Sequence, residues 1–130
     1  MGQPAAKQGD KITGTDLHVL VPPPPATPVA TAMPFNGMLT SGLSTNVLIQ
    51  GRPAATVGSV AINTPPHLPP PVATFQKPPS NQGRVQKGSA TVLINGKGAA
   101  RSGDPAMTCN DPVDLPNGTV VATSTVLIGG

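Results

Sequence analysis

The sequence is short of the residues that build a conventional hydrophobic core. Its 130 residues contain no tryptophan, no tyrosine and only two phenylalanines, Phe35 and Phe75. The single cysteine, Cys109, cannot form a disulfide within the chain. No apolar run is long enough to span a bilayer, and the N-terminus lacks the charged and apolar segments of a signal peptide. Without a large core or a disulfide, stability is expected to come from a metal, a partner or both.

Charge is also sparse. Eight basic and five acidic residues are scattered along the chain, and all five acids are aspartates. A nucleic-acid surface needs clustered lysine and arginine, often with stacking aromatic residues, so we predict no nucleic-acid partner. The chain has no H-E-x-x-H zinc-protease motif and no G-x-S-x-G nucleophile elbow. The sequence therefore indicates neither a hydrolytic site nor a small-molecule substrate.

What the chain does contain is glycine, proline and a repeat. Fifteen glycines and 18 prolines would suggest disorder if they had no period. However, the tripeptide Val-Leu-Ile followed by a glycine-bearing turn occurs three times, at Val47–Gly51, Val92–Gly96 and Val126–Gly130. A repeated short motif of this kind indicates repeated supersecondary units.

A second motif, rich in small residues, follows the first two copies. It reads Pro53–Ser59 and Gly98–Asp104, and its third copy lies at the other end of the chain, Pro4–Asp10. The last Val-Leu-Ile strand therefore has no small-residue motif after it, and the motif Pro4–Asp10 has no such strand before it. Folding the C-terminus back beside the N-terminus completes a closed ring of three units in a single domain, approximately 4–51, 53–96 and 98–130.

We predict an all-β fold with much loop and no significant helix, because apolar residues do not recur at helical spacing. Short strands are expected near the ranges 11–13, 46–50, 56–62, 90–95 and 119–128. Two proline-rich stretches, 22–34 and 65–79, are expected to be rigid surface loops. The alternative interpretation of these stretches is a proline-rich adaptor recognised by proline-binding modules.

Three potential metal ligands follow the small-residue motifs. His18 and His67 each lie nine residues after a repeat glycine, and Cys109 follows the third repeat glycine more closely. Three related units can bring these side chains together on the threefold axis, and imidazole and thiolate are ligands that zinc prefers. The fourth position is left open between Asp114, Asp111, Asp16 and water. An open fourth position would also fit a small zinc hydrolase, and an inert buried thiol is the alternative for Cys109.

The residue after each repeat glycine is Asp10, Ser59 or Asp104. Short polar side chains in this position usually cap a turn by bonding the backbone. We therefore predict a structural role for these three residues and no catalytic one.

Taken as a set, these motifs resemble those of the PAAR-repeat proteins over nearly the whole chain. The resemblance rests on Pro4–Asp10, on Val47–Ala55 and on the stretch from Val92 to Asp104. It implies a small cone-shaped fold of three pseudo-threefold repeats of short strands. It also implies one zinc near the vertex, typically held by three histidines and a cysteine.

Only His18, His67 and Cys109 match that ligand set. Asn63 stands where some family members have a ligand. The motifs also depart from the family pattern at Ser59, in place of aspartate, and at Gly98, in place of proline.

The resemblance further implies a structural, non-enzymatic tip of a contractile injection system, either type VI or phage-tail-like and extracellular. One tip would cap each trimeric β-helical spike protein and sharpen it for puncturing a target envelope, which it meets transiently. We expect it to be made in the bacterial cytoplasm without a signal peptide and delivered outside the cell or into a target. The predicted partner-binding residues are those of the repeated strands, which would take up spike strands by β-augmentation: Val47, Ile49, Val92, Ile94, Val126 and Ile128.

Overall fold

Strands and loops make up the described structure. The computed structural model describes residues 2–130, and none of these residues is helical, which confirms the predicted all-β class. A helix suited to crossing a membrane is accordingly not found in this range. The strands are β1 (Gln3–Pro4), β2 (Lys11–Val21), β3 (Val29–Ser41), β4 (Leu48–Ile49), β5 (Arg52–Pro53), β6 (Val60–Asn63), β7 (Thr74–Phe75), β8 (Gln82–Val85), β9 (Leu93–Ile94), β10 (Lys97–Gly98), β11 (Pro105–Thr108), β12 (Leu115–Val121) and β13 (Leu127–Ile128).

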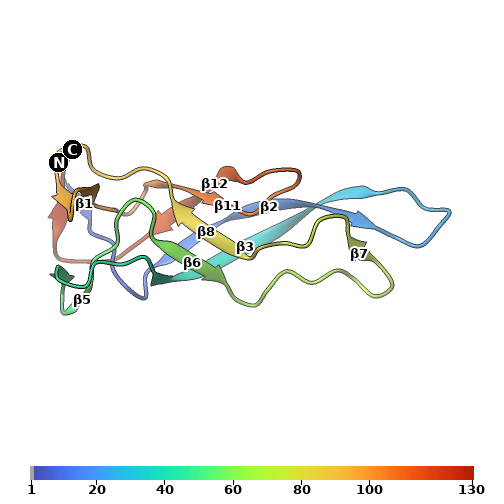
Figure 1. Cartoon of the computed structure of the whole chain (residues 1–130), viewed down its shortest axis with the longest axis horizontal. Coiled ribbons are helices and arrows are strands. Elements are labelled where there is room, and N and C mark those ends of the chain that lie inside the picture. Colours follow the sequence, from blue (N-terminus) through green and yellow to red (C-terminus); the bar gives the residue numbers. More distant parts are fainter. Residues whose placement is uncertain (1) are drawn as a thin grey trace.

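Six antiparallel strands close into a narrow barrel. Their order is β12, β11, β8, β6, β3 and β2, and β2 pairs back with β12. The longest pairing joins β2 to β3, from Lys11 opposite Met38 to Leu20 opposite Val29. This hairpin projects beyond the barrel, where β7 adds to β2 (Figure 1). We call this projecting part, with the loops beside it, the distal end.

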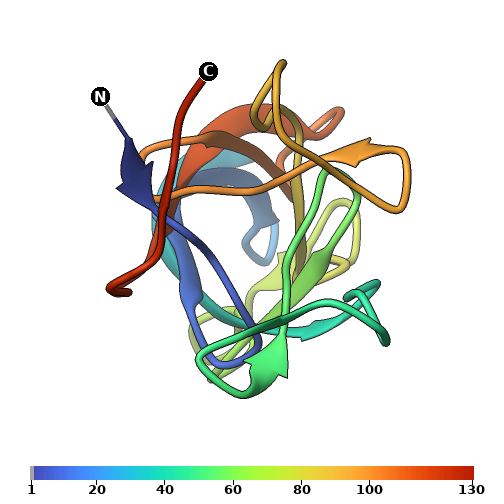
Figure 2. The same ribbon diagram turned by 90° about the vertical axis from the view of Figure 1, so that its left-hand side faces the viewer.

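Three two-stranded hairpins form the opposite end, which we call the base. They pair β4 with β5, β9 with β10, and β1 with β13. The last pair sets Gln3 opposite Ile128, so the two ends of the chain complete one hairpin. Figure 2 looks along the long axis and shows the hairpins spaced around the ring, with both termini at this end.

A ring of three backbone hydrogen bonds links the repeats. The Ala6 N–H donates to the Ala100 carbonyl at 2.9 Å, Ala55 to Ala6 at 3.0 Å, and Ala100 to Ala55 at 3.0 Å. All three alanines are fully buried. The ring therefore needs small side chains, which explains the repeated Ala-Ala pair.

The turn after each alanine pair has the same backbone shape. The φ angles of Gly9, Gly58 and Gly103 are 92°, 93° and 93°, in the left-handed region that favours glycine. The following residue closes each turn: Asp10 Oδ2 accepts from Lys7 N, Ser59 Oγ from Thr56 N, and Asp104 Oδ2 from Arg101 N, at 2.8–3.0 Å. The predicted structural role of Asp10, Ser59 and Asp104 is confirmed.

Apolar side chains form two clusters. One fills the barrel around Phe35, with Ile12, Leu39, Val85 and Val120. The barrel is so narrow that a Cβ at Gly83 would lie 3.0 Å from the Phe35 ring. The second cluster lies under the base hairpins and repeats one isoleucine and one alanine per unit: Ile49, Ile94, Ile128, Ala5, Ala54 and Ala99.

The observed strands differ from several predicted ranges. The range 11–13 is the start of the much longer β2, and 46–50 and 90–95 shrink to the two-residue strands β4 and β9. Within 56–62 the first residues form the repeat turn before β6, and 119–128 divides into the end of β12 and the separate β13. The turns of the small-residue motifs interrupt the strand pairing where the chain passes from the base to the barrel.

The predicted proline-rich loop 22–34 is also shorter than expected, because β3 begins at Val29 and contains Pro34. Pro34 lies opposite Thr15 of β2. Since β6 pairs with β3 only from Gly37 onward, Pro34 stands on an edge where its missing N–H breaks no ladder bond. The loop 65–79 likewise contains the short strand β7.

Candidate metal centre

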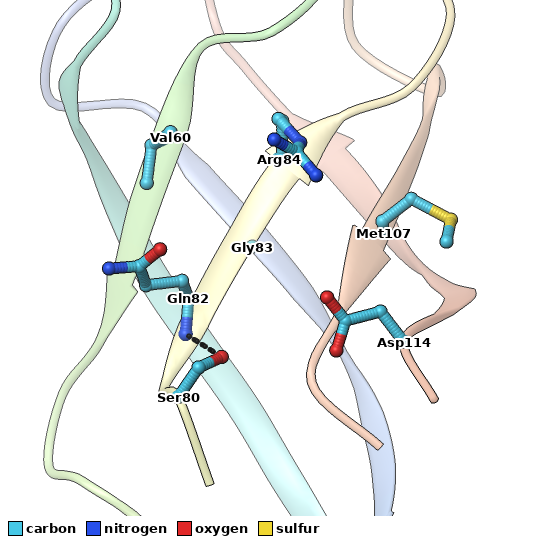
Figure 3. A pocket seen from close by; sticks show the side chains of 7 residues that line it. All are labelled: Val60, Ser80, Gln82, Gly83, Arg84, Met107 and Asp114. Carbon is cyan, nitrogen blue, oxygen red and sulfur yellow. Dashed lines mark hydrogen bonds between the residues drawn. The ribbon is translucent and has the colours of Figure 1, made fainter. Parts of the chain in front are cut away.

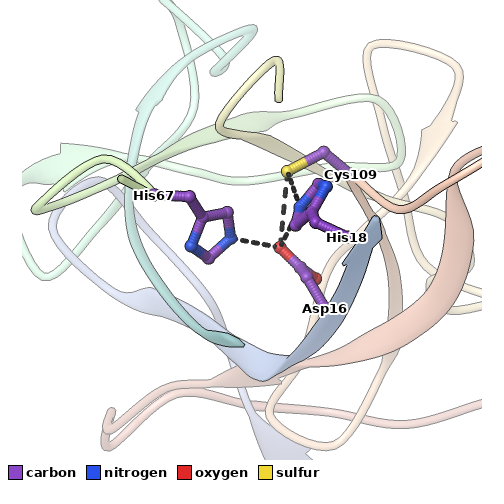
Figure 4. Close-up of side chains that lie close together, drawn as sticks. All are labelled: Asp16, His18, His67 and Cys109. Atoms are coloured by element: carbon purple, nitrogen blue, oxygen red, sulfur yellow. Dashed lines mark hydrogen bonds and ion pairs between the residues drawn. The ribbon is translucent and has the colours of Figure 1, made fainter. Parts of the chain in front are cut away.

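Four side chains that can bind a metal meet in the distal half of the molecule. Asp16 and His18 lie two residues apart on β2, so both point to the same face of the strand. His67 comes from the loop between β6 and β7, and Cys109 directly follows β11. All four are buried, and their ligand atoms lie within 4.8 Å of one another (Figure 4).

Asp16 is the centre of this group. Its Oδ2 lies 2.8 Å from His67 Nε2, 3.3 Å from Cys109 Sγ and 4.0 Å from His18 Nε2. Cys109 Sγ lies 3.7 Å from His18 Nε2. In tetrahedral zinc sites with bonds of about 2.0–2.3 Å, neighbouring ligand atoms stand roughly 3.3–3.8 Å apart. Of the four observed spacings, 3.3 and 3.7 Å fall within this range, and 2.8 and 4.0 Å lie below and above it, so the group could hold one metal ion after small adjustments.

The structure brings together His18, His67 and Cys109, the three predicted ligands. Of the candidates for the fourth position, Asp16 lies in the cluster and Asp114 is exposed to solvent. Asp111 lies just outside, with its Oδ2 3.8 Å from His18 Nδ1. The alternation of a strand, which places Asp16 on the same face as His18, was the signal that could have singled it out.

Burial sets the protonation of the metal-free group. The pKa of Cys109 is raised to about 11 by burial and by the nearby Asp16 carboxylate, so the thiol keeps its proton at neutral pH. The pKa of His18 is lowered, first by burial and then by His67, so its imidazole is neutral. A bound cation would instead favour the deprotonated thiolate of Cys109, because metals bind thiolate and neutral imidazole and release protons.

Some polar atoms of the cluster residues and of the neighbouring Asp111 are also unpaired. Among the residues that the structure describes, Asp16 Oδ1, His18 Nδ1 and Asp111 Oδ1 are buried without a hydrogen-bond partner. Such atoms are costly unless something compensates them. The donor set of one sulfur, two imidazole nitrogens and one carboxylate suits zinc. A pocket of about 50 Å³, lined in part by His18, Lys77 and Cys109, opens beside the group.

Asn63 is not part of the cluster. Its Nδ2 lies 3.3 Å from His67 Nδ1, on the side of the ring away from Asp16. Phe35 and Phe75 pack near the imidazoles, with ring centroids 6.4 Å from His67 and 5.7 Å from His18 respectively. The two phenylalanines of the chain thus both border the metal site.

The side chains of the predicted partner-binding isoleucines face inward, away from solvent. Ile49, Ile94 and Ile128 are 5–7% exposed and belong to the base cluster. Neighbouring residues in a strand point to opposite faces, so the leucine before each isoleucine faces solvent. The exposed fractions of Leu48, Leu93 and Leu127 are 58%, 60% and 62%. Val92 and Val126 are also exposed, and Val47 is half-buried against the base cluster.

A separate pocket lies on the outer wall of the barrel, over β6, β8 and β11 (Figure 3). Its volume is about 150 Å³, and Arg84 and Asp114 are its charged lining residues. No histidine or cysteine lines it.

Comparison with known families agrees with the repeat pattern. The family model described as the PAAR motif matches residues 75–130. This segment contains Cys109, the third alanine pair and the last Val-Leu-Ile strand. No curated protein matches the chain at a significant level. The predicted resemblance to the PAAR-repeat proteins is confirmed.

Proposed function

We propose, from the premise that this is a PAAR-repeat protein, that it is the non-enzymatic tip that caps a trimeric β-helical spike, one copy per trimer. The PAAR motif supports a spike-tip type of protein in contractile injection systems and association with a spike protein. The capping geometry, the envelope-puncturing role and the metal identity are our proposal. Delivery outside the cell or into a target, by a type VI or a phage-tail-like particle, follows from that role.

The observation that carries the proposal is the threefold base. Each of its three hairpins presents one exposed leucine, and the exposed fractions of these leucines differ by only a few percent. The ring of bonds between Ala6, Ala55 and Ala100 holds the hairpins in equivalent positions. A monomer with three equivalent contacts can meet three identical subunits of a trimer. We therefore assign partner contact to Leu48, Leu93 and Leu127, with Val92 and Val126 beside them.

The base hairpins also have unpaired backbone groups at a strand edge, where a strand of the spike could pair. In each hairpin one strand already accepts an N–H from the next repeat, through the carbonyl of Pro4, Pro53 or Gly98. The opposite edge, formed by β13, β4 or β9, is the one left as a template for another strand. Strands of the spike that continued onto these edges would bury the leucines and pair the backbone together. The interface would then combine β-augmentation with apolar contact.

We propose a structural zinc ion held by Asp16, His18, His67 and Cys109. Four protein donors leave no open position for a catalytic water, and a closed four-ligand site is typical of structural zinc. The group is buried, whereas a hydrolase needs access for its substrate. These features favour the spike tip over the zinc-hydrolase alternative.

The adaptor alternative is also less favoured. Polyproline II recognition requires an extended segment without internal hydrogen bonds. Instead, the Ala26 N–H donates to the Pro23 carbonyl and the Ala73 N–H to the Pro70 carbonyl, so both proline runs bend into turns. These loops join strands at the distal end, away from the base (Figure 1).

Native mass spectrometry with a trimeric spike protein from the same source organism tests the proposal. We expect one copy per trimer, and loss of the complex when Leu48, Leu93 and Leu127 are all changed to aspartate. Leu68→Asp is the matched control, because Leu68 is 74% exposed but lies in the distal loop 65–79. A wild-type protein that does not bind the spike, or equal loss with the control, would contradict the capping role.

A further inference from the structure

The two imidazoles of the metal centre have different partners on their outer nitrogens. Both rings direct Nε2 toward the cluster and Nδ1 away from it. His67 Nδ1 faces the amide of Asn63, whereas His18 Nδ1 faces the carboxylate of Asp111. Since the outer partner decides which nitrogen carries the proton, the two histidines should not share a tautomer.

The orientation of the Asn63 amide is fixed by its neighbours. Its Oδ1 accepts the Asn36 backbone N–H at 2.9 Å, and its Nδ2 donates to Asn81 Oδ1 at 3.2 Å. Asn81 Oδ1 also accepts the backbone N–H of His67 at 2.8 Å, so the Asn81 amide cannot flip without losing that bond. Asn63 therefore presents a donor to His67 Nδ1. In this state the His67 proton is on Nε2, where it donates to Asp16 Oδ2 at 2.8 Å.

Asp111 creates the opposite situation at His18. Its backbone N–H donates to the Leu17 carbonyl at 2.8 Å, and its Oδ2 accepts the Val19 N–H at 2.8 Å. Asp111 thus bonds to β2 on both sides of His18, and its side chain is only 6% exposed. The unpaired atoms Asp111 Oδ1 and His18 Nδ1 belong to this same buried contact. An N–H···O bond of about 2.9 Å would require the 3.8 Å separation to shorten by roughly 0.9 Å.

We propose that Asp111 is a positioning residue that holds the His18 proton on Nδ1 and so keeps Nε2 free for the metal. A carboxylate beside a ligating histidine fixes its tautomer and ring orientation and raises its basicity. His18 is then preset for metal, whereas His67 must move its proton from Nε2 to Nδ1 and give up the Asn63 contact. This inference rests on the proposed metal centre.

Nitrogen-15 NMR of the wild-type imidazoles tests the tautomers directly, without a mutation. In metal-free protein we expect the proton on Nδ1 of His18 and on Nε2 of His67. With zinc bound we expect Nδ1–H on both rings, so that only His67 changes. A His18 proton on Nε2 in the metal-free protein, or zinc bound through His18 Nδ1, would overturn the proposal.

Zinc affinity, measured by competition with a chromophoric chelator, gives the second readout. Asp111→Asn keeps an oxygen for the Val19 N–H but loses the negative charge, and we expect zinc binding to weaken about 10- to 100-fold. Asp114→Asn makes the same charge change at an exposed site nearby and should keep the wild-type affinity.

The possible failures are distinguishable. Wild-type protein that binds no zinc would refute the proposed metal centre and this inference with it. Wild-type protein that binds zinc, with equal affinity in Asp111→Asn, would refute the role of Asp111 alone. Equal weakening in Asp114→Asn would mean that overall charge, and not the Asp111 contact, sets the affinity. If Asp111→Asn fails to fold, the wild-type NMR assignment decides.

Discussion

The base and the distal end of this molecule are held together in different ways. At the base, each repeat contributes the same parts: an alanine in the hydrogen-bond ring, a buried isoleucine and an exposed leucine. At the distal end the repeats contribute unequally. The first supplies two candidate ligands and the long hairpin, and the other two supply one ligand each.

This difference shows which part of the chain needs symmetry. Apolar packing and backbone bonds stabilise the base in the absence of any ligand, and its equivalence suits a threefold partner. The distal end instead buries Asp16, His18, His67 and Cys109 close together, which costs free energy unless the polar atoms are compensated. A metal requires only that four donors converge, so the repeats need not be equivalent there.

Removing the proposed zinc should therefore have the largest effect, and it should act on the distal end. A ligand present at 1,000 times its Kd stabilises the folded state by about 4 kcal/mol, so chelation should lower the Tm markedly. Hydrogen exchange should accelerate along the distal part of the β2–β3 hairpin, while the amides of Ala6, Ala55 and Ala100 stay protected. Calorimetry and exchange mass spectrometry, with and without chelator, measure both.

Single-ligand variants give the matched test. His18→Ala, His67→Ala and Cys109→Ser should each lower the Tm and the bound zinc together, and Asp16→Asn should do the same. Unchanged metal content in all four variants would rule out the metal centre. Re-adding zinc to the chelated wild type is the control for irreversible damage.

Acid should act in the same direction. Folding lowers the pKa of His18, so the folded protein binds fewer protons than the unfolded chain, whose histidines titrate near pH 6.5. The contribution of His18 to stability should be complete above about pH 6.5 and fall as the pH drops below it, with zinc released in the same range. A melting temperature and zinc content that stay constant from pH 7.5 to 5 would contradict this expectation.

The base could be predicted from sequence better than the distal end, for a physical reason. Repeated Ala-Ala and Val-Leu-Ile segments report repeated contacts, so the closure of β13 onto β1 followed from the missing halves of the pattern. The same repeats did not reveal which face of each strand was buried, because a period of two fits either face. The sequence therefore predicts the valines and isoleucines of these segments as partner contacts, whereas the structure buries the isoleucines and exposes the leucines.

At the distal end the sequence information comes from single residues and not from repeated motifs. The spacing of His18, His67 and Cys109 predicted convergence, but five scattered aspartates gave no unique fourth ligand. The full extent of β3 was missed because Pro34 usually indicates a loop, and only the register shows that it lies on an open edge. Such facts depend on tertiary pairing, which no local pattern contains.

Overfilling the base ring should have the next largest effect. Ala55 is fully buried, and its N–H and carbonyl both take part in the ring. Ala55→Leu adds three carbons where no space exists, and we expect a loss of about 3 kcal/mol, at the upper end of the usual cost of overpacking. Ala32→Leu, on the exposed outer part of β3, is the control and should melt like the wild type.

The ring variant also separates the two ends. Ala55→Leu should weaken spike binding more than zinc binding, because it displaces the base hairpins and leaves the ligands in place. Zinc loss equal to that of Cys109→Ser would show instead that the base and the metal centre fold as one unit.

The smallest predicted effect concerns the middle repeat turn, where the threefold pattern breaks. Ser59 Oγ accepts the Thr56 N–H at 2.9 Å and donates to the Gly42 carbonyl at 2.8 Å. Ser59→Ala leaves the buried Thr56 N–H unpaired and removes the bond to the Gly42 carbonyl, and urea unfolding should show a loss of about 2 kcal/mol. Ser41→Ala, at an exposed position one residue before Gly42, should cost almost nothing.

The Ser59→Asp variant tests whether the turn itself or the residues around it require serine at this position. The other two turns pair their aspartate with a cation, Lys7 with Asp10 and Arg101 with Asp104. In the middle unit Thr56 takes the position of the cation, so an aspartate at 59 would be buried without a partner and could not donate to Gly42. We expect it to be at least as unstable as the alanine variant, and Thr56→Arg to restore part of the loss. A Ser59→Asp protein as stable as the wild type would mean that the three turns are interchangeable and that the asymmetry begins only beyond the barrel.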